Sequence, residues 1–515
     1  MRLSELLRAL PEPPISVSPN DDPEITVVAH HTQRVVPGAL FVAVYHRGYS
    51  VDRHEFVGQA VEAGAAAIVV SRPVDVPPRV AIVTVRNTAA AFGWLSAQRH
   101  GMPSHRLGVV GVTGTDGKTT TCTLTAAVLD AAGFGTGMAT TVASKSTGPA
   151  VPNPHHTSTP EADEIQALLA RTVAEGGTRA VLEATSHALD QDRLAGTEVD
   201  VAVVTRVTHE HMEYHGTPEQ YLAAKARLLD LLLPNPRTPK AERVDKAAVL
   251  NADDDNSFPR FAPRSPAPVL SYGLGPAAAL RAVDVHRRQW GTEFRVVSPW
   301  GEARLELRMP GEFNVYNALA AVGAGCTLGA PFHVALDALA VQKGVRGRME
   351  RIDSGQPYTV VVDFAHTPDS LERALKLLRS QTAGRVFVVF GSAGERDVPK
   401  RAWMGRIAAK LADLSIFADE DPRREPSEKI LDDIAAGAVE VGAREGEQFL
   451  KIADRREAIA EALRRARAGD TVLLAGKGHE RSIIGQRDGQ LYTFPWDEHA
   501  VARELLSELG FGGRG

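Results

Sequence analysis

Residues 107–121 read LGVVGVTGTDGKTTT, and this stretch decides the fold of the chain around it. Its apolar start predicts a short buried strand. Three glycines, Gly111, Gly114 and Gly117, then predict a tight loop, and residues 118–133 have the pattern of a helix. In such a strand–loop–helix, backbone N–H groups and the helix N-terminus bind phosphate, and a lysine reaches the terminal phosphates.

The loop departs from the strict phosphate-binding pattern at one position. That pattern has a glycine six residues before the lysine, where this chain has Val112; its glycines lie seven, four and one residue before Lys118. The alternative is a structural turn between a strand and a helix. Because two threonines follow Lys118, and a hydroxyl at Thr119 suits Mg²⁺, we favour a nucleotide phosphate site.

Composition and charge exclude several classes of protein. The chain has 515 residues, and a prior of about 150 residues per domain predicts about three domains. A formal net charge of −5 provides no basic field for nucleic acid or an anionic membrane. Two cysteines, Cys122 and Cys326, are too few for a disulfide framework or a zinc site and indicate a reducing compartment. Without a signal peptide or an apolar run of about 20 residues, we expect a cytoplasmic protein with no nucleic-acid partner and no membrane insertion.

The order of the expected elements divides the chain into three parts. Residues 1–105 contain short strands and a helix. Residues 106–343 alternate apolar strands with helical stretches, which predicts a mostly parallel sheet with helices on both faces. Residues 344–515 repeat this alternation. The expected fold class is therefore α/β with three domains, the central one a P-loop-type domain with a mostly parallel sheet and the C-terminal one Rossmann-like.

Polar residues follow two strands of the central part. Glu183 lies at the end of one strand, where doubly wound folds place ligands. The next strand leads into residues 207–217, VTHEHMEYHGT, which cluster acidic residues and histidines. Mg²⁺ prefers oxygen ligands and tolerates one imidazole. Taken alone, His211 is more often structural, but its place after a strand in a chain with a phosphate loop favours a metal ligand. Lys225, in the following helix, is by default a solvated lysine.

Three polar loops follow strands in the last part of the chain: residues 391–401 (GSAGERDVPKR), 418–426 (ADEDPRREP) and 473–480 (LLAGKGHE). Because the carboxyl ends of parallel strands meet at one edge, we expect the loops to converge. Their mixed charge suits a zwitterionic ligand, since arginine binds carboxylates and carboxylates bind ammonium groups. The alternative for any one loop is an ion pair that only ties the loop together.

These motifs together resemble those of the Mur ligase family, the ATP-dependent amide-forming enzymes that build the peptide stem of the cell wall. The likeness extends over nearly the whole chain. Within the family it is greatest to the members that add a diamino acid to UDP-N-acetylmuramoyl-L-alanyl-D-glutamate. The motifs that support it are GVTGTDGKTTT (111–121), HTSTPE (156–161), LEATSHALDQDR (182–193), EHMEYHGT (210–217) with Lys225 downstream, MPGEFNVYNALAA (309–321), GRMERI (347–352), VVDFAHTPDSLERAL (361–375), GERDVPKR (394–401), EDPRRE (420–425) and AGKGHE (475–480).

The resemblance implies roles for four groups of residues. ATP is bound by Gly114, Thr115, Asp116, Gly117, Lys118, Thr119, Thr120, Asn314, Arg348, Asp363 and His366. The UDP-linked substrate is bound by Thr32, Thr157, Ser158, Thr159, Thr185, Gln191 and Arg193. The incoming amino acid is bound by Arg396, Glu420, Asp421, Pro422, Arg423, Gly476 and Glu480. Catalysis involves Lys118, Glu183, His211 and Lys225, and Mg²⁺ is held by Thr119, Glu183, His211 and Lys225, which is carbamylated in this family.

The resemblance also implies the reaction and its partners. ATP, a co-substrate, phosphorylates a carboxylate of UDP-N-acetylmuramoyl-dipeptide, and the amine of a diamino acid attacks the acyl phosphate. Both steps concentrate anionic charge, which Lys118, the Mg²⁺ cofactor and backbone N–H groups offset. Residues 1–105 are then the UDP-substrate-binding domain, 106–343 the ATP-binding domain and 344–515 the amino-acid-binding domain. We expect a monomer.

The chain departs from the family pattern at several positions. The usual Asp-His is Glu210-His211, and Arg206 stands where an asparagine is usual. The first-domain DSR-type motif is His-Thr-Gln at residues 31–33. Two alternatives therefore remain open: a folylpolyglutamate synthase-like ligase, and a non-catalytic Mur-ligase-like binding subunit. The first domain and the two loops at 420–425 and 475–480 argue against the former. Retention of the four catalytic residues argues against the latter.

The added residue is expected to be ornithine or lysine, with diaminopimelate close behind. Diaminopimelate has an ammonium and a carboxylate at its far end, whereas ornithine and lysine have only the ammonium. In resembling enzymes that use diaminopimelate, the Asn and Arg of a DNPR motif face the far carboxylate. Arg423 remains here, but Asp421 replaces the Asn and Glu420 adds negative charge. At about 4 Å and an effective dielectric near 20, Asp421 and a charged group of the ligand would interact by roughly 4 kcal/mol before screening. This interaction repels the far carboxylate of diaminopimelate and attracts an ammonium.

Overall fold

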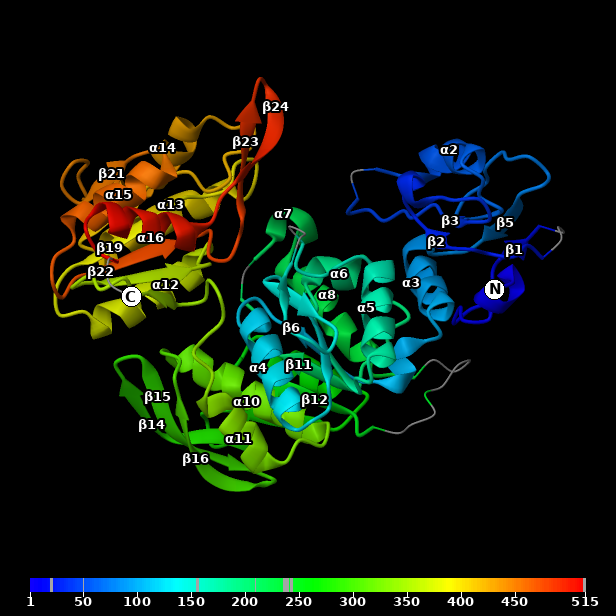
Figure 1. The fold of residues 1–515 in the computed structure, drawn as a ribbon, viewed down its shortest axis with the longest axis horizontal. Coiled ribbons are helices and arrows are strands. Elements are labelled where there is room, and N and C mark those ends of the chain that lie inside the picture. The colour runs from blue at the N-terminus through cyan, green and yellow to red at the C-terminus, as the bar shows by residue number, and fades with distance from the viewer. Residues whose placement is uncertain are drawn as a thin grey trace.

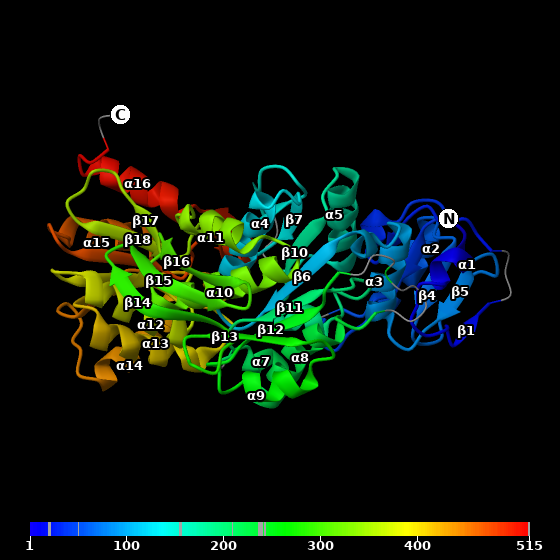
Figure 2. The same ribbon diagram turned by 90° about the horizontal axis from the view of Figure 1, so that it is seen from below.

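A computed structural model describes residues 1–18, 22–49, 51–153, 157–208, 210–234, 240 and 244–512. These residues form three separate sheets of five, eleven and six strands and a two-stranded hairpin, with helices packed on the sheets (Figure 1). Each sheet takes its strands from a successive stretch of the chain, and Figure 2 shows the sheets in a row with the eleven-stranded sheet in the middle. The predicted α/β class with mostly parallel sheets is confirmed.

The first sheet has the strand order β1-β5-β4-β3-β2, in which only β1 pairs antiparallel. Helices α1 and α3 cover one face and α2 covers the other, so the strands β3 and β4 are buried on both sides. The elements are α1 (Leu3–Leu7), β1 (Ser16–Val17), β2 (Val28–Ala29), β3 (Leu40–Val42), α2 (Val57–Glu62), β4 (Ala67–Val70), β5 (Ala81–Thr84) and α3 (Thr88–Arg99).

The central sheet has the order β16-β15-β14-β13-β12-β11-β6-β10-β7-β8-β9. The strands from β14 to β7 in this order run parallel, and two antiparallel strands extend each edge. The elements are β6 (Gly108–Thr113), α4 (Lys118–Ala131), β7 (Thr136–Ala139), β8 (Ala143–Lys145), β9 (Val151–Pro152), α5 (Ala162–Ala174), β10 (Arg179–Glu183), α6 (Ser186–Asp190), β11 (Val201–Val204), α7 (Met212–His215), α8 (Pro218–Asp230), β12 (Ala247–Asn251), α9 (Phe258–Phe261), β13 (Val269–Gly273), β14 (Leu280–Arg288), β15 (Gly291–Ser298), β16 (Gly301–Leu307), α10 (Glu312–Thr327) and α11 (Phe332–Ala340).

The central strand β6 shows why the sheet is covered on both faces. All six of its residues are buried. Val110 and Val112 pack with α4, α10 and α11, whereas Val109 packs with α5, α6 and α8 on the opposite face. Successive side chains of a strand point to opposite faces, so a strand with helices on both sides is apolar along its whole length.

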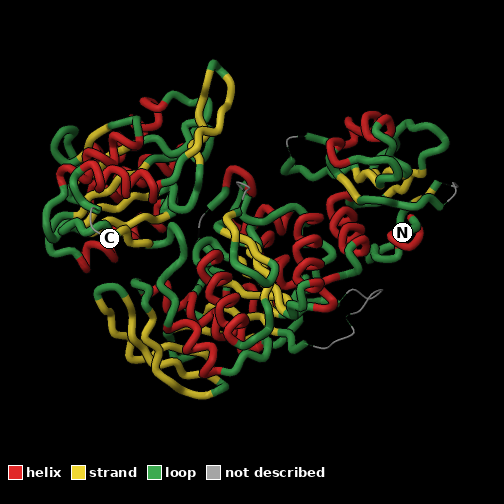
Figure 3. Tube along the Cα trace, in the orientation of Figure 1, coloured by secondary structure: helices red, strands yellow, loops and turns green. Residues whose placement is uncertain are grey.

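The third sheet has the order β17-β18-β22-β19-β20-β21, and only β17 pairs antiparallel. Helices α12, α13 and α14 cover one face, and α15 and α16 cover the other. The hairpin of β23 and β24 projects from this part of the molecule (Figure 3). The elements are β17 (Glu350–Ile352), β18 (Thr359–Asp363), α12 (Pro368–Gln381), β19 (Val386–Phe390), α13 (Val398–Leu411), β20 (Leu414–Phe417), α14 (Ser427–Glu440), β21 (Phe449–Lys451), α15 (Arg455–Arg465), β22 (Thr471–Ala475), β23 (Ser482–Arg487), β24 (Gln490–Pro495) and α16 (Glu498–Glu508).

Candidate active site

The phosphate loop connects β6 to α4, as the sequence predicts. Gly114 has φ +148° and Gly117 has φ +83°, values that favour glycine. A Cβ on Gly114 would lie 1.9 Å from Thr205 Oγ1, and one on Gly117 would lie 2.4 Å from Asn317 Oδ1. Gly117 is also the N-cap of α4 and provides no side-chain cap. The first N–H groups of the helix are therefore left for an anion.

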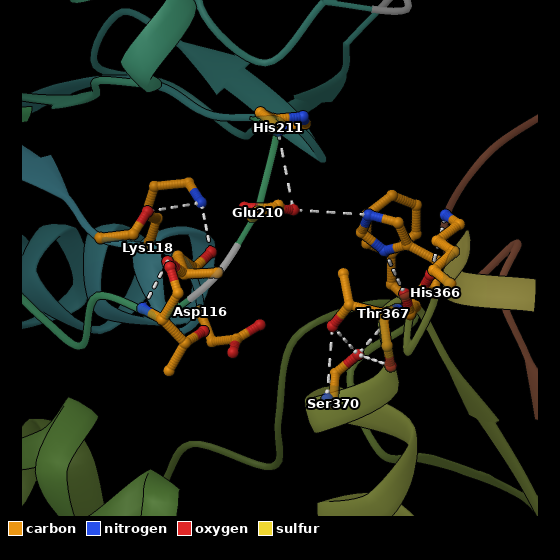
Figure 4. A network of polar contacts seen from close by, with 12 residues as sticks. Asp116, Lys118, Glu210, His211, His366, Thr367 and Ser370 are labelled. Atoms are coloured by element: carbon orange, nitrogen blue, oxygen red, sulfur yellow. Dashed lines mark hydrogen bonds and ion pairs between the residues drawn. The ribbon is translucent and has the colours of Figure 1, made fainter. Parts of the chain in front are cut away.

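Lys118 and Thr119 begin α4, and their side chains point into different parts of the site. The ammonium of Lys118 donates to the carbonyls of Gly114 and Thr115 at 3.0 and 2.6 Å, so it lies on the loop (Figure 4). The hydroxyl of Thr119 is buried and donates to Glu183 at 2.9 Å. The next residue, Thr120, is also buried. The Lys118 ammonium, which suits phosphate, is therefore separated from the oxygen atoms of Thr119 and Glu183, which suit a cation.

Glu183, at the end of β10, lies in a pocket of hydroxyl groups. Its carboxylate accepts from the Thr119 hydroxyl, and from the N–H and hydroxyl of Thr141 at 2.9 and 2.8 Å. Only 2% of the residue is exposed. Carboxylate and hydroxyl oxygens are the donors that Mg²⁺ prefers, so this set fits the implied cation.

A second group of polar side chains surrounds Glu210, in the segment after β11. Glu210 lies 3.6 Å from His211 Nε2 and 3.7 Å from His366 Nε2, which comes from the loop after β18. Burial by itself would raise the pKa of Glu210, but His211 and Lys118 lower it to about 2. Figure 4 shows Glu210 between Lys118 on one side and His366 on the other. Glu210 thus connects the central sheet with the third sheet.

Lys225 lies beneath the phosphate loop, in α8. The side chain is buried, and its Nζ donates to the carbonyl of Gly114 at 2.6 Å. Burial, and then the nearby charge of Lys118, hold the pKa of the Lys225 ammonium well below its usual range. The hydroxyl of Tyr221, one helical turn earlier, lies 2.9 Å from Thr115 Oγ1 and donates to Glu210 at 3.2 Å. The default expectation of a solvated lysine is therefore wrong, because α8 packs with this face against the loop.

The structure does not bring Glu183 and His211 into one cluster. Glu183 contacts the two threonines, whereas His211 lies beside Glu210 and Glu213. Among the described residues, no three His, Cys, Asp or Glu side chains form a group that could hold a metal ion by themselves. Mg²⁺ commonly keeps several waters and uses one or two carboxylates with substrate phosphates, so such a group is not a requirement.

The other nucleotide-side candidates come from three further places: the segment before β17, the end of β18, and α10. Arg348 donates to Thr119 Oγ1 at 3.3 Å and lies over the ring of Phe364 at 4.6 Å. Asp363, at the end of β18, accepts from the N–H groups of Met349 and Ala365 at 2.6 and 2.8 Å. Asn314 is buried in α10 and donates to the Pro310 carbonyl at 2.8 Å.

Three of the seven candidates for the UDP-linked substrate, Thr159, Thr185 and Arg193, lie together at the C-terminal end of β10. Thr159 donates to the carbonyl of Glu183 at 2.8 Å and lies 3.3 Å from Thr185 Oγ1. Arg193 donates to the carbonyl of Thr159 at 3.0 Å. Four candidates remain. Gln191 donates to Tyr214, and the carbonyl of Thr157, which precedes Ser158, accepts from Asn153. Thr32 starts the short 3₁₀ helix Thr32–Arg34 near the first sheet.

The three charged loops of the third sheet converge, as predicted. Asp421 accepts from the ammonium of Lys477 at 2.9 Å and from the N–H of Ile484 at 2.8 Å. Lys477 also pairs with Glu480 at 2.5 Å and is 1% exposed. A Cβ on Gly476 would lie 3.1 Å from Glu420 Oε2. The remaining candidates are Arg396, Pro422 and Arg423, whose pKa is lowered by burial and by the charge of Arg396.

Sequence reasoning missed several residues of the site. Lys477 was not singled out, although a lysine inside the glycine-rich AGKGHE loop is a signal for a role there. Thr141 and Tyr221 gave no signal, because their contacts depend on how the loops and helices pack. Arg373 was also missed: it pairs with Asp116 from α12, on the other side of the site.

Comparisons with known proteins show the family of the chain. Residues 112–325 match the family model of the Mur ligase middle domain, and residues 347–478 match that of the Mur ligase glutamate ligase domain. A UDP-N-acetylmuramyl-tripeptide synthetase of Roseiflexus sp. (strain RS-1) is 48% identical over the full length of both chains. A UDP-N-acetylmuramoyl-L-alanyl-D-glutamate--2,6-diaminopimelate ligase of Bacillus cereus is 38% identical over 98% of this chain and 99% of the relative.

A solved structure described as a UDP-N-acetylmuramoyl-L-alanyl-D-glutamate--2,6-diaminopimelate ligase is also similar. It has a TM-score of 0.64 and 29% identity over 94% of this chain and 95% of the other. The fold and site define an ATP-dependent ligase that forms amide bonds. The chain belongs to the Mur ligase family, as the motifs predict. Among the described helices, none is both long and apolar enough to cross a membrane.

Proposed function

We propose that this chain is a peptidoglycan-precursor ligase that joins a diamino acid to UDP-N-acetylmuramoyl-L-alanyl-D-glutamate at the expense of ATP. The observation that carries the proposal is the position of Glu210: it lies 3.7 Å from His366 of the third part, and Tyr221 links it to Thr115 of the phosphate loop. The names of full-length relatives support the same substrate and argue against the folylpolyglutamate synthase-like alternative. We place the protein in the cytoplasm, as a monomer.

Each of the three parts has its own substrate in this proposal. Residues 1–105 bind the UDP group, residues 106–343 bind ATP, and residues 344–515 bind the amino acid. Support comes from the three sheets, which take their strands from these parts in turn. It also comes from the glycines of the phosphate loop and from the mixed charge around Lys477.

The reaction has two steps. A carboxylate oxygen of the substrate attacks the γ-phosphorus of ATP, and ADP leaves. The diamino acid nitrogen then attacks the acyl carbon, inorganic phosphate leaves, and the nitrogen loses a proton. Lys118 and the N–H groups at the start of α4 offset the charge on the phosphoryl oxygens. Thr119 and Glu183 would hold one Mg²⁺ ion and His211 with carbamylated Lys225 a second, and the ions would supply further positive charge to these oxygens.

We propose that Lys225 is carbamylated, and its surroundings support this. The uncharged amine is favoured because the side chain is buried and lies near Lys118. An uncharged amine attacks CO₂, forming an N–C bond and releasing one proton, and the product is an anionic carbamate. This exchange puts a negative charge beneath the phosphate loop, where the Gly114 carbonyl now accepts from the amine.

We propose ornithine or lysine as the added residue. Glu420, Asp421 and Glu480 bring three carboxylates to the converging loops, and the single charge of the buried Lys477 balances one of them. The remaining negative charge attracts the side-chain ammonium, while Arg423 and Arg396 are left for the α-carboxylate. Side-by-side kcat/KM values for ornithine, lysine and meso-diaminopimelate test this, and a clear preference for diaminopimelate contradicts it.

Phosphate release tests the function itself. We expect release from ATP only when UDP-N-acetylmuramoyl-dipeptide and a diamino acid are both present, together with a UDP-linked tripeptide product. Omitting either substrate is the matched control. Absence of the product with all three diamino acids would reject the proposed ligase and favour the non-catalytic binding subunit.

A further inference from the structure

Asp116 places a carboxylate inside the phosphate loop, between Thr115 and Gly117. The loop backbone is fixed there: the Asp116 carbonyl accepts from the Thr205 hydroxyl at 2.6 Å, and the Thr115 N–H donates to the Arg206 carbonyl at 2.6 Å. The backbone that carries this carboxylate is therefore held within the loop whose N–H groups would bind an anion. Negative charge at this point opposes the field that Lys118 and the N-terminus of α4 provide for phosphate.

An arginine from the third part of the chain meets this carboxylate. Arg373, in the middle of α12, forms an ion pair with Asp116 across 257 residues of sequence. Its guanidinium also lies 2.9 Å from Asp369, one helical turn earlier. The side chains of Arg373 and Asp116 are 24% and 32% exposed, so water and salt screen the pair less than a pair on an open surface.

We infer that Arg373 is a positioning residue for nucleotide binding, which neutralises Asp116 and so makes the phosphate loop competent for an anionic ligand. The inference rests on the proposed role of the loop in ATP binding. Helix α12 packs on the third sheet, whereas the phosphate loop follows a strand of the central sheet. The loop therefore has its full affinity for the nucleotide only while α12 lies against it. If this placement of α12 raises the affinity for the nucleotide by some factor, bound nucleotide favours the placement by the same factor.

Binding of ADP with Mg²⁺, measured by titration calorimetry, tests the inference without a complete reaction. Arg373→Gln leaves Asp116 unpaired, and we expect the Kd for ADP to rise about five- to tenfold. Adding Asp116→Asn to this variant keeps the backbone N–H of residue 116, through which the loop would bind phosphate, and removes only the uncompensated charge; we expect the Kd to return to within about twofold of wild type. Lys376→Gln is the matched control, because Lys376 lies on the same helix, pairs with Glu372 and is 61% exposed. We expect no change in its Kd.

Two results would overturn the inference. An unchanged Kd in Arg373→Gln shows that the pair has no effect on the nucleotide. A double variant as weak as Arg373→Gln shows that Arg373 acts on the nucleotide directly and not through Asp116. If Arg373→Gln does not fold by circular dichroism, Asp116→Asn alone decides: ADP binding as tight as or tighter than wild type supports the inference, and weaker binding contradicts it. Wild-type protein that binds no ADP would reject the proposed function together with the inference.

Discussion

At the scale of single residues, Lys118 places a positive charge on the phosphate loop. Its ammonium lies 3.0 and 2.6 Å from the carbonyls of Gly114 and Thr115, so it is held where phosphoryl oxygens gain charge. We expect Lys118→Ala to lower kcat by about 10²-fold or more, because the transition state loses this partner. Phosphate release measures the effect, with circular dichroism as the control for folding. Turnover near the wild-type rate would contradict the assignment of the loop.

Lys225 is the residue whose chemistry depends most on burial. The side chain is 1% exposed, and its pKa is held well below the usual range by burial and then by Lys118. We expect Lys225→Ala to lose activity, because the variant has no amine to carry the carbamate. Short carboxylic acids should restore part of the activity by supplying the missing negative charge. Mass spectrometry of active enzyme should find the carbamate after trapping; an unmodified lysine together with an active Ala variant would contradict the proposal.

At the scale of elements, strands with helices on both faces were predictable, because burial on both sides requires apolar residues throughout. All residues of β6, of β10 after Arg179, and of β11 are buried, and only Thr113 and Glu183, each the last residue of its strand, are not apolar. The antiparallel strands β14 to β16 were not predicted, since their outer residues are exposed and the parallel alternation ends there. The motifs also predicted which loops form the site, but they did not predict Arg373. Its partner Asp116 lies 257 residues away, and its position in a helix is typical of a solvated arginine.

The pair of helices α13 and α14 depends on glycine for its close approach. A Cβ on Gly405 would lie 1.9 Å from the carbonyl oxygen of Ile434, which belongs to the backbone and cannot rotate away. We expect Gly405→Ala to lower the free energy of unfolding by about 1–3 kcal/mol, the usual cost of overpacking. Urea unfolding measures it.

Gly58 provides the matched control for this substitution. It lies in α2, and apart from its chain neighbours and the backbone of its own helix, nothing lies within 4 Å of the Cβ that Gly58→Ala would add. We expect this variant to be as stable as wild type or more stable, by about 0.5–1 kcal/mol, because alanine favours the helix. Equal destabilisation of the two variants would show that the helix contact is not the cause.

At the scale of the whole molecule, the two outer sheets contact the central sheet at different places. The first part contacts it through α3 and through Arg34, which pairs with Asp163 and Glu164 at 2.7 and 2.9 Å. The third part contacts it at the phosphate loop, through the bond from Arg348 to Thr119 and through the pairing of Arg373. The UDP-linked substrate and the nucleotide should therefore respond to changes at different interfaces.

Gly93 tests this separation. It lies in α3, and a Cβ there would lie 2.4 Å from the carbonyl oxygen of Ala195, two residues after Arg193. Gly93→Ala must push α3 and this segment apart, so we expect the KM for UDP-N-acetylmuramoyl-dipeptide to rise severalfold. The Kd for ADP should stay within about twofold of wild type, because the phosphate loop has no part in this contact. Gly58→Ala, in the same part of the chain, is the control and should change neither constant. A parallel rise in the Kd for ADP would show instead that the two interfaces act as one.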